Sequence, residues 1–396
     1  MKGAWCCSMT ERRVEELRRS MAEAGVDVAV ITHIIDVYYF SGTGNRSTLI
    51  VPLEGEPKLL VQVGYERAKE DSWISDVRRA GGTSDIKRVL DELGLSRGVV
   101  GLNMDTISAG FYLKLSSILK EAKLVNVSPL VLDVRSVKDK NEVELIEKAA
   151  EISRIGHKRV EEVLEPGITE LELAVEVECT LRRAGHDGFI RHRTWRFNAY
   201  GVIGPSGPNL GVITGPGAIT ITGPGTCPAL PYGASNRRIE KGDMVLVDFV
   251  VSYMGYHHDE ARMYAVGDVD SRKVKSFKLV KEAEEQALEA IKPGRPVSDL
   301  YWAARSVFER EGLLDYFAAY SEYPQYTYLG HGIGLEVVEE PSITPGNDKL
   351  LRPGMTICIE PKLIAPDWGA SFEDTVLVEE DGPRILSKTP RELIYV

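Results

Sequence analysis

Residues 242–262 read GDMVLVDFVVSYMGYHHDEAR, and this stretch decides the fold. A mostly apolar run leads into Asp248, and a second run continues from Tyr253-Met254 to Asp259. We interpret the pattern as a β-hairpin that turns at Tyr253-Met254, about which the two aspartates are symmetric. Residues that oppose each other in an antiparallel pair share one face, with Cβ atoms about 5 Å apart. The hairpin is therefore expected to present two carboxylates on one face.

A second predicted hairpin, residues 355–380, repeats this arrangement. Its Glu360 and Glu373 are nearly symmetric about Asp367, and His331 precedes it in a glycine-rich GHGIG run. Four converging carboxylates would repel one another strongly as bare charges, and divalent cations are the usual remedy. Oxygen-rich sites with one histidine suit hard to borderline metals, and two such ions lie about 3.5–4 Å apart. The predicted metal ligands are Asp248, Asp259, His331, Glu360 and Glu373.

Simpler interpretations of these residues exist. His331 could be a buried structural histidine, and the aspartates could be solvated hairpin charges. Asp248, however, follows a mostly apolar run and would be a buried charge without a partner. His257 and His258 adjoin Asp259, and since only one of them can face the metals, we expect surface positions for them. The metal site is thus the favoured interpretation.

A duplication surrounds the two hairpins. Two helix pairs are predicted, and each first helix ends at a Pro-Gly dipeptide. Each second helix ends at a glycine 18 positions after the dipeptide's glycine (185 − 167 and 312 − 294). Thr169 and Glu172 form a candidate capping box for one of them. Helix–helix–hairpin thus occurs twice, which implies two similar halves about an approximate two-fold axis. The predicted helices are residues 142–164, 169–184, 271–291 and 298–311.

The N-terminal part has a different pattern. A length of 396 residues favours two or three domains. Short apolar runs typical of buried strands alternate there with helical patterns. We therefore predict an α/β domain at residues 1–134, a polar linker at 135–141 and a second domain at 142–396. The runs are 26–32, 47–53, 57–63 and 98–103, and the helical patterns are 10–24, 84–93 and 110–119.

Composition excludes several classes of protein. The net charge of −11 opposes a long basic groove for nucleic acid. No apolar run approaches the 18 residues of a membrane span, and the first residues have no apolar segment of a secretory signal. Either Met1 or Met9 could be the native start. An odd cysteine count without regular spacing argues for a reducing compartment, and we expect a cytoplasmic protein.

Several segments together resemble the proline-peptidase and methionine-aminopeptidase superfamily. The similarity includes Xaa-Pro dipeptidases and aminopeptidases P. It implies an α+β protein with a creatinase-like N-terminal α/β domain and a C-terminal pita-bread domain of duplicated helix–helix–hairpin units. The segments that carry the resemblance are DVAVITHIIDVYYFSGT (27–43), GDMVLVDFVVSYMGYHHDEAR (242–262), GHGIGLE (330–336), GMTICIEP (354–361) and FEDTVLV (372–378).

The resemblance assigns roles to the predicted ligands. Asp248 would chelate one metal, and His331 with Glu360 would hold the other. Asp259 and Glu373 would bridge the two ions, which would be manganese, cobalt or zinc. The partners implied are a small peptide substrate and a second copy of the chain in a homodimer, without nucleic acid or membrane.

The chain departs from the family pattern on the substrate side. Val338 and Pro231 stand where typical members carry histidines, and Ser371 stands where they often carry an arginine. Another group must then stabilise the developing oxyanion. The stretch FIRHRTWRF (189–197) is basic and aromatic, and we interpret it as an active-site loop that binds a carboxylate, with nucleic-acid stacking as the alternative. The predicted substrate-binding residues are His192, Arg193, Tyr232 and Arg262.

The activity expected from these features is hydrolysis of an Xaa-Pro bond by a hydroxide that bridges two metals. Glu360 would shuttle the proton to the leaving nitrogen, and His331 would complete the catalytic pair. One alternative is a metal-dependent hydrolase of a non-peptide C–N bond, as in creatinase-like and ectoine-hydrolase-like relatives. Another is a catalytically silent binding protein with the same fold. An unused cluster of four carboxylates would be destabilising, which disfavours the silent protein.

Overall fold

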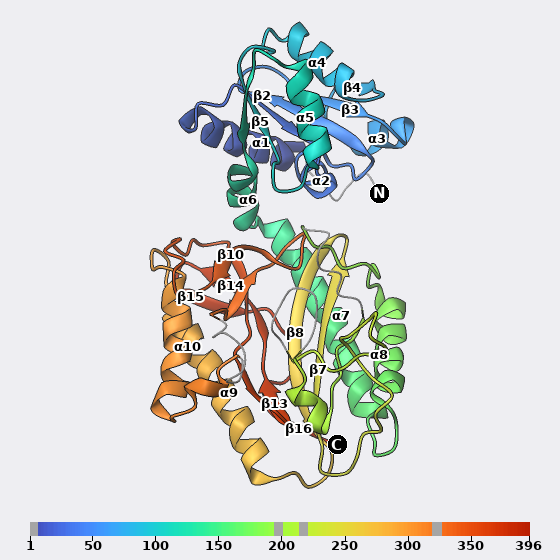
Figure 1. The fold of residues 1–396 in the computed structure, drawn as a ribbon, viewed down its shortest axis with the longest axis vertical. Coiled ribbons are helices and arrows are strands. Elements are labelled where there is room, and N and C mark those ends of the chain that lie inside the picture. Colours follow the sequence, from blue (N-terminus) through green and yellow to red (C-terminus); the bar gives the residue numbers. More distant parts are fainter. Residues whose placement is uncertain (1–6, 194–200, 214–220, 319–326) are drawn as a thin grey trace. The chain divides into compact units, whose positions relative to one another are not determined.

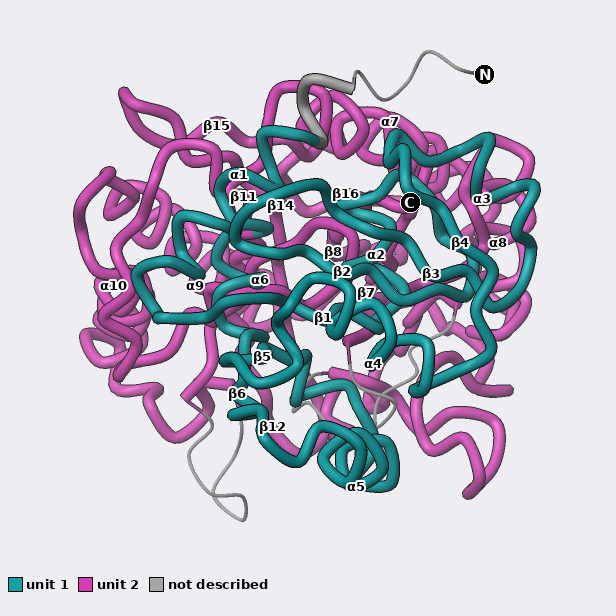
Figure 2. Tube along the Cα trace, turned by 90° about the horizontal axis from the view of Figure 1, so that it is seen from above, with its two compact units in different colours: residues 1–135 teal, residues 136–396 magenta. Residues whose placement is uncertain are grey.

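The chain forms two compact units, Met1–Arg135 and Ser136–Val396, coloured separately in Figure 2. Among the described residues, no helix combines the length and the apolar character that crossing a bilayer requires. The computed structural model describes residues 7–193, 201–213, 221–318 and 327–396.

The connection between the units is short. Helix α6 (Ser128–Ser136) is followed by helix α7 (Lys140–Val163), so only residues 137–139 lie between the two helices. Lys138 in this gap is buried, and its Nζ lies 3.0 Å from an Oε atom of Glu339. Most of the predicted linker 135–141 therefore belongs to the ends of α6 and α7, and Lys138 between them is buried.

Unit 1 is a six-stranded mixed sheet with helices. Strand β1 pairs antiparallel with β2 and parallel with β5, in the order β4-β3-β2-β1-β5-β6. The strands are β1 (Val28–Ile31), β2 (Ser47–Pro52), β3 (Lys58–Val61), β4 (Asp76–Arg79), β5 (Val99–Leu102) and β6 (Lys123–Asn126). The helices are α1 (Cys7–Glu23), α2 (Ile34–Ser41), α3 (Tyr65–Asp71), α4 (Thr83–Glu92), α5 (Ala109–Ile118) and the α6 already given.

The sequence patterns predicted the centre of this sheet and missed its edges. All four residues of β1 are buried, and the runs predicted for β1, β2, β3 and β5 are confirmed. The missed strands β4 and β6 are the two edge strands and have no fully buried residue. Their sequences, DVRR and KLVN, lack a continuous apolar run, which is the signal of a buried strand.

Unit 2 confirms the predicted duplication. Figure 1 shows the helix pairs α7/α8 and α9/α10 on opposite sides of the strands that they enclose. The first half contains α7, α8 (Glu170–Ala184), η1 (Gly207–Gly211), β7 (Met244–Tyr253) and β8 (Tyr256–Ala265). The second half contains α9 (Ser271–Ala290), α10 (Ser298–Arg310), η2 (Leu314–Tyr316), β9 (Gly330–Gly332), β10 (Glu339–Ile343), β11 (Thr356–Ile359), β12 (Lys362–Ala365), β13 (Trp368–Ser371), β14 (Asp374–Glu379), β15 (Gly382–Ile385) and β16 (Ile394–Tyr395).

Helix α8 begins and ends as its sequence predicts. The Thr169 side chain accepts a hydrogen bond from the Glu172 backbone N–H, and the Glu172 side chain accepts one from the Thr169 N–H. This capping box satisfies two N–H groups that a helix start leaves unpaired. At the other end Gly185 adopts a φ of 113°, a left-handed conformation that glycine reaches without a Cβ clash.

The first hairpin differs from its predicted register. Tyr253 pairs with Tyr256, so the turn is Met254-Gly255, one residue later than predicted. Both turn residues have positive φ, 49° and 86°, as a two-residue hairpin loop requires. The predicted direct opposition of the two aspartates is therefore wrong, because Asp248 lies opposite Ala261. The aspartates still share a face, since the offset is two residues and side chains alternate with period two.

Alternation along β7 decides which face carries Asp248. Val245, Val247 and Phe249 pack into the apolar cluster that includes α7 and α8. Met244 and Leu246 belong instead to the cluster that includes α9, α10 and the second hairpin. Because strand side chains alternate, Asp248 continues the Met244–Leu246 face. The first hairpin thus points its carboxylate towards the second hairpin.

The second hairpin consists of two strand pairs that share one register. In the first pair Ile359 of β11 lies opposite Asp374 of β14, and in the second pair Lys362 of β12 lies opposite Ser371 of β13. Continuing that register across the break places Glu360 directly opposite Glu373. Proline at 361 has no N–H to donate to a ladder, which accounts for a break at this position.

Candidate metal centre

Asp248, Asp259 and Glu373 meet where the two hairpins touch. One carboxylate oxygen of each lies within 4.8 Å of the others. The backbone N–H of Glu373 donates to the carbonyl of Ala261 on β8, at 3.3 Å. The hydroxyl of Thr375 donates to the Asp259 carbonyl at 2.8 Å, and the Asp259 N–H donates to that hydroxyl at 3.1 Å. Hydrogen bonds between the hairpins therefore hold this trio, which we call the carboxylate trio.

His331 lies beside the trio, on strand β9. Its Nε2 is 3.7 Å from Oε1 of Glu360, and its Nδ1 is 3.0 Å from the carbonyl oxygen of Gly332. A carbonyl only accepts, so this contact assigns the proton to Nδ1 and leaves the Nε2 lone pair for another partner. His331 also groups with Glu373 and Cys358, one ligand atom of each within 4.8 Å.

The glycines around His331 have a packing reason. A Cβ on Gly330 would lie 1.9 Å from the carbonyl oxygen of Cys358, and a Cβ on Gly332 would lie 2.3 Å from that of Glu340. Neither distance leaves room for a side chain. The GHG sequence therefore allows β9 to fit tightly between its neighbours β10 and β11, with His331 opposite Cys358.

Burial sets the electrostatics of the cluster. Asp248, Asp259 and Glu373 are only 8%, 7% and 2% exposed. Burial raises the pKa of Asp248 to about 7, with Glu360 adding and Lys362 opposing. Burial, followed by repulsion from neighbouring carboxylates, raises the pKa of Asp259 and of Glu373 well above their ordinary values. These groups are costly to ionise without a cation.

Two oxygens of the trio lack a partner within the described part of the chain. They are Oδ1 of Asp259 and Oε1 of Glu373, both fully buried. Buried polar atoms are normally hydrogen-bonded, so each exception calls for an explanation. Anionic oxygens that converge without donors fit a divalent cation. The residues present therefore fit the metal centre that the sequence predicts.

Lys362 is a member of the cluster that the sequence patterns missed. Its ammonium contacts Oε2 of Glu360, and its side chain is 5% exposed. Burial opposes its charge, but attraction to Glu360, Glu373 and Asp248 outweighs burial and raises the pKa of Lys362. The available signal was its position, two residues after a predicted ligand.

Cys358, which the sequence patterns did not single out, also reaches the cluster. Its Sγ lies 3.4 Å from Oγ1 of Thr375. Burial, together with the nearby Glu373 and Asp259, raises its pKa well above the ordinary value. The thiol form is therefore favoured beside these carboxylates. Its signal was its position two residues before Glu360, at the end of β11.

The predicted substrate-binding residues have different surroundings in the structure. His192 lies near His331, and burial together with that histidine lowers the pKa of His192 to about 4. Arg193 Nη1 lies 3.5 Å from Oε2 of Glu336. Tyr232 is partly buried. Residues 194–197 of the predicted basic and aromatic loop lie outside the described residues.

Arg262 does not fit its predicted substrate-binding role. It is 0% exposed, and its Nη2 lies 2.6 Å from Asp374 and 2.9 Å from Glu260. Its guanidinium also stacks on the ring of Phe372, 4.5 Å from the centroid. Nη1 donates to the backbone carbonyl of Glu373 at 2.7 Å. Arg262 therefore binds the backbone of a predicted ligand and has no exposed surface.

His257 and His258 are fully buried, so their predicted surface positions are wrong. Nδ1 of His257 lies 2.9 Å from the carbonyl oxygen of Gly334, and its Nε2 accepts from the Arg191 N–H at 3.1 Å. The histidine thereby ties the loop before His192 to the loop after His331. Two adjacent polar residues, His257 and His258, gave no indication in the sequence that both faces of their strand are buried.

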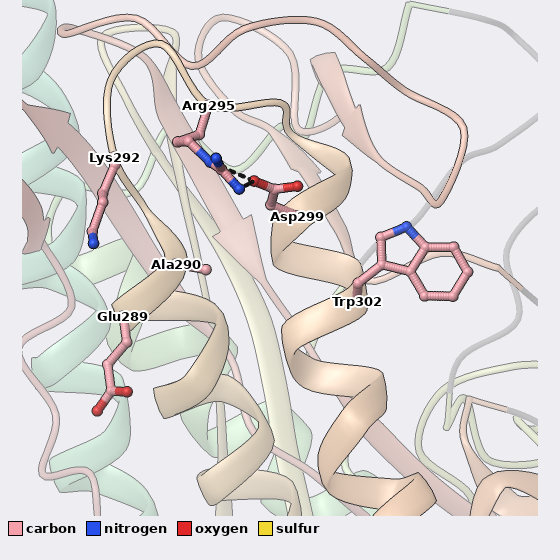
Figure 3. Close-up of a pocket in the computed structure, with 6 residues that line it drawn as sticks. All are labelled: Glu289, Ala290, Lys292, Arg295, Asp299 and Trp302. Carbon is pink, nitrogen blue, oxygen red and sulfur yellow. Dashed lines mark hydrogen bonds and ion pairs between the residues drawn. The ribbon is translucent and has the colours of Figure 1, made fainter.

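Two hollows of unit 2 lie away from the cluster. One of about 510 Å³ lies where α9 ends and α10 begins, and Figure 3 shows the Arg295–Asp299 ion pair in it, 2.6 Å apart. A second of about 510 Å³ lies at the equivalent place on α7 and α8. Neither hollow includes a predicted ligand. The chemistry of the side chains, not cavity size, locates the site. The first hollow is lined by Glu289, Ala290, Lys292, Arg295, Asp299 and Trp302.

Comparisons with known proteins cover both units. Residues 144–380 match Metallopeptidase family M24, and residues 13–137 match the Creatinase/Prolidase N-terminal domain. An Xaa-Pro dipeptidase of Pyrococcus furiosus is 32% identical over 97% of this chain and 100% of its own length. A probable dipeptidase, PepE, of Mycobacterium tuberculosis is 33% identical over 97% of this chain and 96% of its own. The solved Xaa-Pro dipeptidase of Bacillus anthracis has a TM-score of 0.84 at 25% identity, and covers 98% of this chain and 100% of that chain.

Proposed function

The chain belongs to metallopeptidase family M24, with a creatinase-like N-terminal domain and a pita-bread domain, and from this premise we propose that it hydrolyses the Xaa-Pro bond of a small peptide. The family makes it a hydrolase and confirms the predicted resemblance. The observation that carries the proposal is the buried carboxylate trio with its two unpartnered oxygens. The relatives named Xaa-Pro dipeptidase support the choice of substrate.

The predicted ligands would hold two divalent ions, of manganese, cobalt or zinc. Asp248 would hold one ion, and His331 and Glu360 the other, with Asp259 and Glu373 shared. When bound, such ions lower the pKa of water and polarise a carbonyl. The orphaned oxygens of Asp259 and Glu373 support their shared role.

The remaining steps belong to side chains of this chain. Glu360 moves a proton from the nucleophile to the leaving nitrogen, as a carboxylate within reach of both can. His192, which burial keeps neutral at physiological pH, donates to the developing oxyanion. Arg193 and Tyr232 bind the peptide. Arg262 positions Glu373 and takes no part in binding.

A second candidate is hydrolysis of a non-peptide C–N bond. It is favoured by Val338 and Pro231, which replace the histidines of typical members. Val338 has no polar side-chain atom that could replace a histidine, and it is 44% exposed. The cytoplasmic location, the homodimer and the absence of nucleic-acid and membrane partners stay predictions.

The test is a substrate panel with metal-depleted protein and manganese, cobalt or zinc added in turn. Xaa-Pro dipeptides are expected to be cleaved, and matched Xaa-Ala dipeptides to be cleaved much less. Longer Xaa-Pro peptides separate a dipeptidase from an aminopeptidase. Turnover of small amides alone would support the second candidate. Failure to cleave any substrate with any metal would contradict the proposal and favour the silent binding protein.

A further inference from the structure

The two residues on either side of Glu373 contact the same two arginines. The guanidinium of Arg262 lies over the ring of Phe372, 4.5 Å from its centroid, and that of Arg391 lies 5.5 Å from the same centroid. On the other side, Oδ1 of Asp374 lies 2.6 Å from Nη2 of Arg262, and Oδ2 lies 2.7 Å from Nε of Arg391. Each oxygen of Asp374 thus binds a different arginine.

Arg391 comes from the segment that follows β15, and contacts on both sides fix the position of this segment. Nη2 of Arg391 contacts Oε2 of Glu284, a fully buried carboxylate on α9. Two residues earlier, the N–H of Thr389 donates to Glu260 at 3.1 Å, and the carbonyl of Thr389 accepts from Arg262 at 3.1 Å. Charges of opposite sign therefore alternate through this network, in the order Glu260, Arg262, Asp374, Arg391 and Glu284.

The ladder between β11 and β14 does not include Glu373. Its last pair is Ile359 with Asp374, one residue before Glu373 is reached. The N–H of Glu373 donates to the carbonyl of Ala261 at 3.3 Å, and its own carbonyl accepts from Nη1 of Arg262 at 2.7 Å. The direction of the Glu373 carboxylate therefore depends on how firmly its two neighbours in the chain are held.

We propose that Arg391 is a positioning residue, which fixes the direction of the Glu373 carboxylate through the neighbouring Asp374. It contacts neither metal nor substrate in this role. Partners that orient a metal ligand from outside the site are typically worth about 10–100-fold in metal affinity or activity. The inference rests on the proposed metal centre, and it makes the segment after β15 a part of the support of that centre.

Four variants separate positioning from a general effect on packing. Arg391→Met removes the guanidinium from both of its carboxylates, and Arg391→Lys keeps the charge without the fork of donors. Glu284→Gln changes the other partner of Arg391 and leaves the contact with Asp374. The matched control is Arg384→Met, because Arg384 of β15 also binds two carboxylates, and neither of them adjoins a predicted ligand.

The measurement is the Mn²⁺ affinity of the metal-depleted full chain, by calorimetry, together with kcat and KM for an Xaa-Pro dipeptide. We expect Arg391→Met to weaken Mn²⁺ binding and lower kcat by about tenfold or more, with KM unchanged. Arg391→Lys should recover part of both losses, because an ammonium can still pair with Asp374. Glu284→Gln and Arg384→Met should keep the wild-type Mn²⁺ affinity.

If Arg391→Met does not fold, it is combined with Glu284→Gln. The double variant removes both partners of one ion pair, which often costs less than removing one of them, and Asp374 still loses Arg391. Wild-type Mn²⁺ affinity in the folded single or double variant would overturn the inference and leave the metal centre intact. Failure of the wild type to cleave Xaa-Pro dipeptides, with the expected order of Mn²⁺ affinities, would overturn the proposed function alone.

Discussion

Raising the pH of the metal-free protein is expected to weaken its fold, because Asp248 ionises much later in the folded state than in the unfolded chain. Burial moves its pKa from 3.8 to about 7. Between these values the folded protein keeps a proton that the unfolded chain has lost, so folding stability falls as the pH rises. The stability is fully present below about 3.8 and the loss is complete above about 7.

The size of this loss follows from the two pKa values. At about 1.4 kcal/mol per pH unit, a rise from 3.8 to about 7 corresponds to about 4 kcal/mol. That is a large part of the roughly 5–15 kcal/mol that stabilises a typical domain. Asp259 and Glu373, whose pKa values burial also raises, add to the loss in the same direction.

The assay is urea unfolding of the chelator-treated full chain from about pH 4 to about pH 8, compared with Asp248→Asn. The wild type should lose about 4 kcal/mol more than the variant over this range. Adding Mn²⁺ at the upper end should restore wild-type stability, because the ion binds the folded state alone. A wild-type curve parallel to that of Asp248→Asn would refute the reasoning.

Three further predictions concern the surroundings of the centre. Gly330→Ala places a Cβ 1.9 Å from the β11 backbone and should lower the melting temperature by several degrees, whereas Gly346→Ala, with nothing within 4 Å, should leave it unchanged. Arg262→Met removes the buried guanidinium from Glu260 and Asp374 and should cost about 3–5 kcal/mol in urea unfolding, with KM unchanged in the folded fraction; a raised KM would restore its predicted substrate role. His192→Ala should lower kcat about 10²-fold with metal content unchanged, and an unaltered kcat would assign the oxyanion donor elsewhere.

Much of unit 2 could be predicted because its patterns are long and repeated. The Pro-Gly ends, the capping box at Thr169 and the two hairpins each follow from local residue chemistry. The register of β7 and β8 was not predicted correctly, since the choice between a turn at Tyr253-Met254 and one at Met254-Gly255 moves every cross-strand pair. Gly255 carried the signal, because it favours positive φ in a two-residue turn.

The residues that were missed or misjudged depend on tertiary contacts. Cys358 looks like an ordinary strand residue until β9 and β14 flank it, and Lys362 does so until it contacts Glu360. Arg262 beside a ligand suggested a substrate contact, yet Asp374, distant in sequence, pairs with it. His257 and His258 are both buried because each face of β8 is covered. Residue spacing reports which face a side chain shares, but it does not report what covers that face.

The division of the carboxylates between two hairpins has a consequence for how this protein assembles. Asp248 and Asp259 come from the first half of the duplicated unit, and Glu360 and Glu373 come from the second. A fragment holding either half would carry only two of the four predicted carboxylate ligands. A polypeptide of half this length would need a second copy of itself to complete the set, so fusion of the halves makes the centre independent of protein concentration.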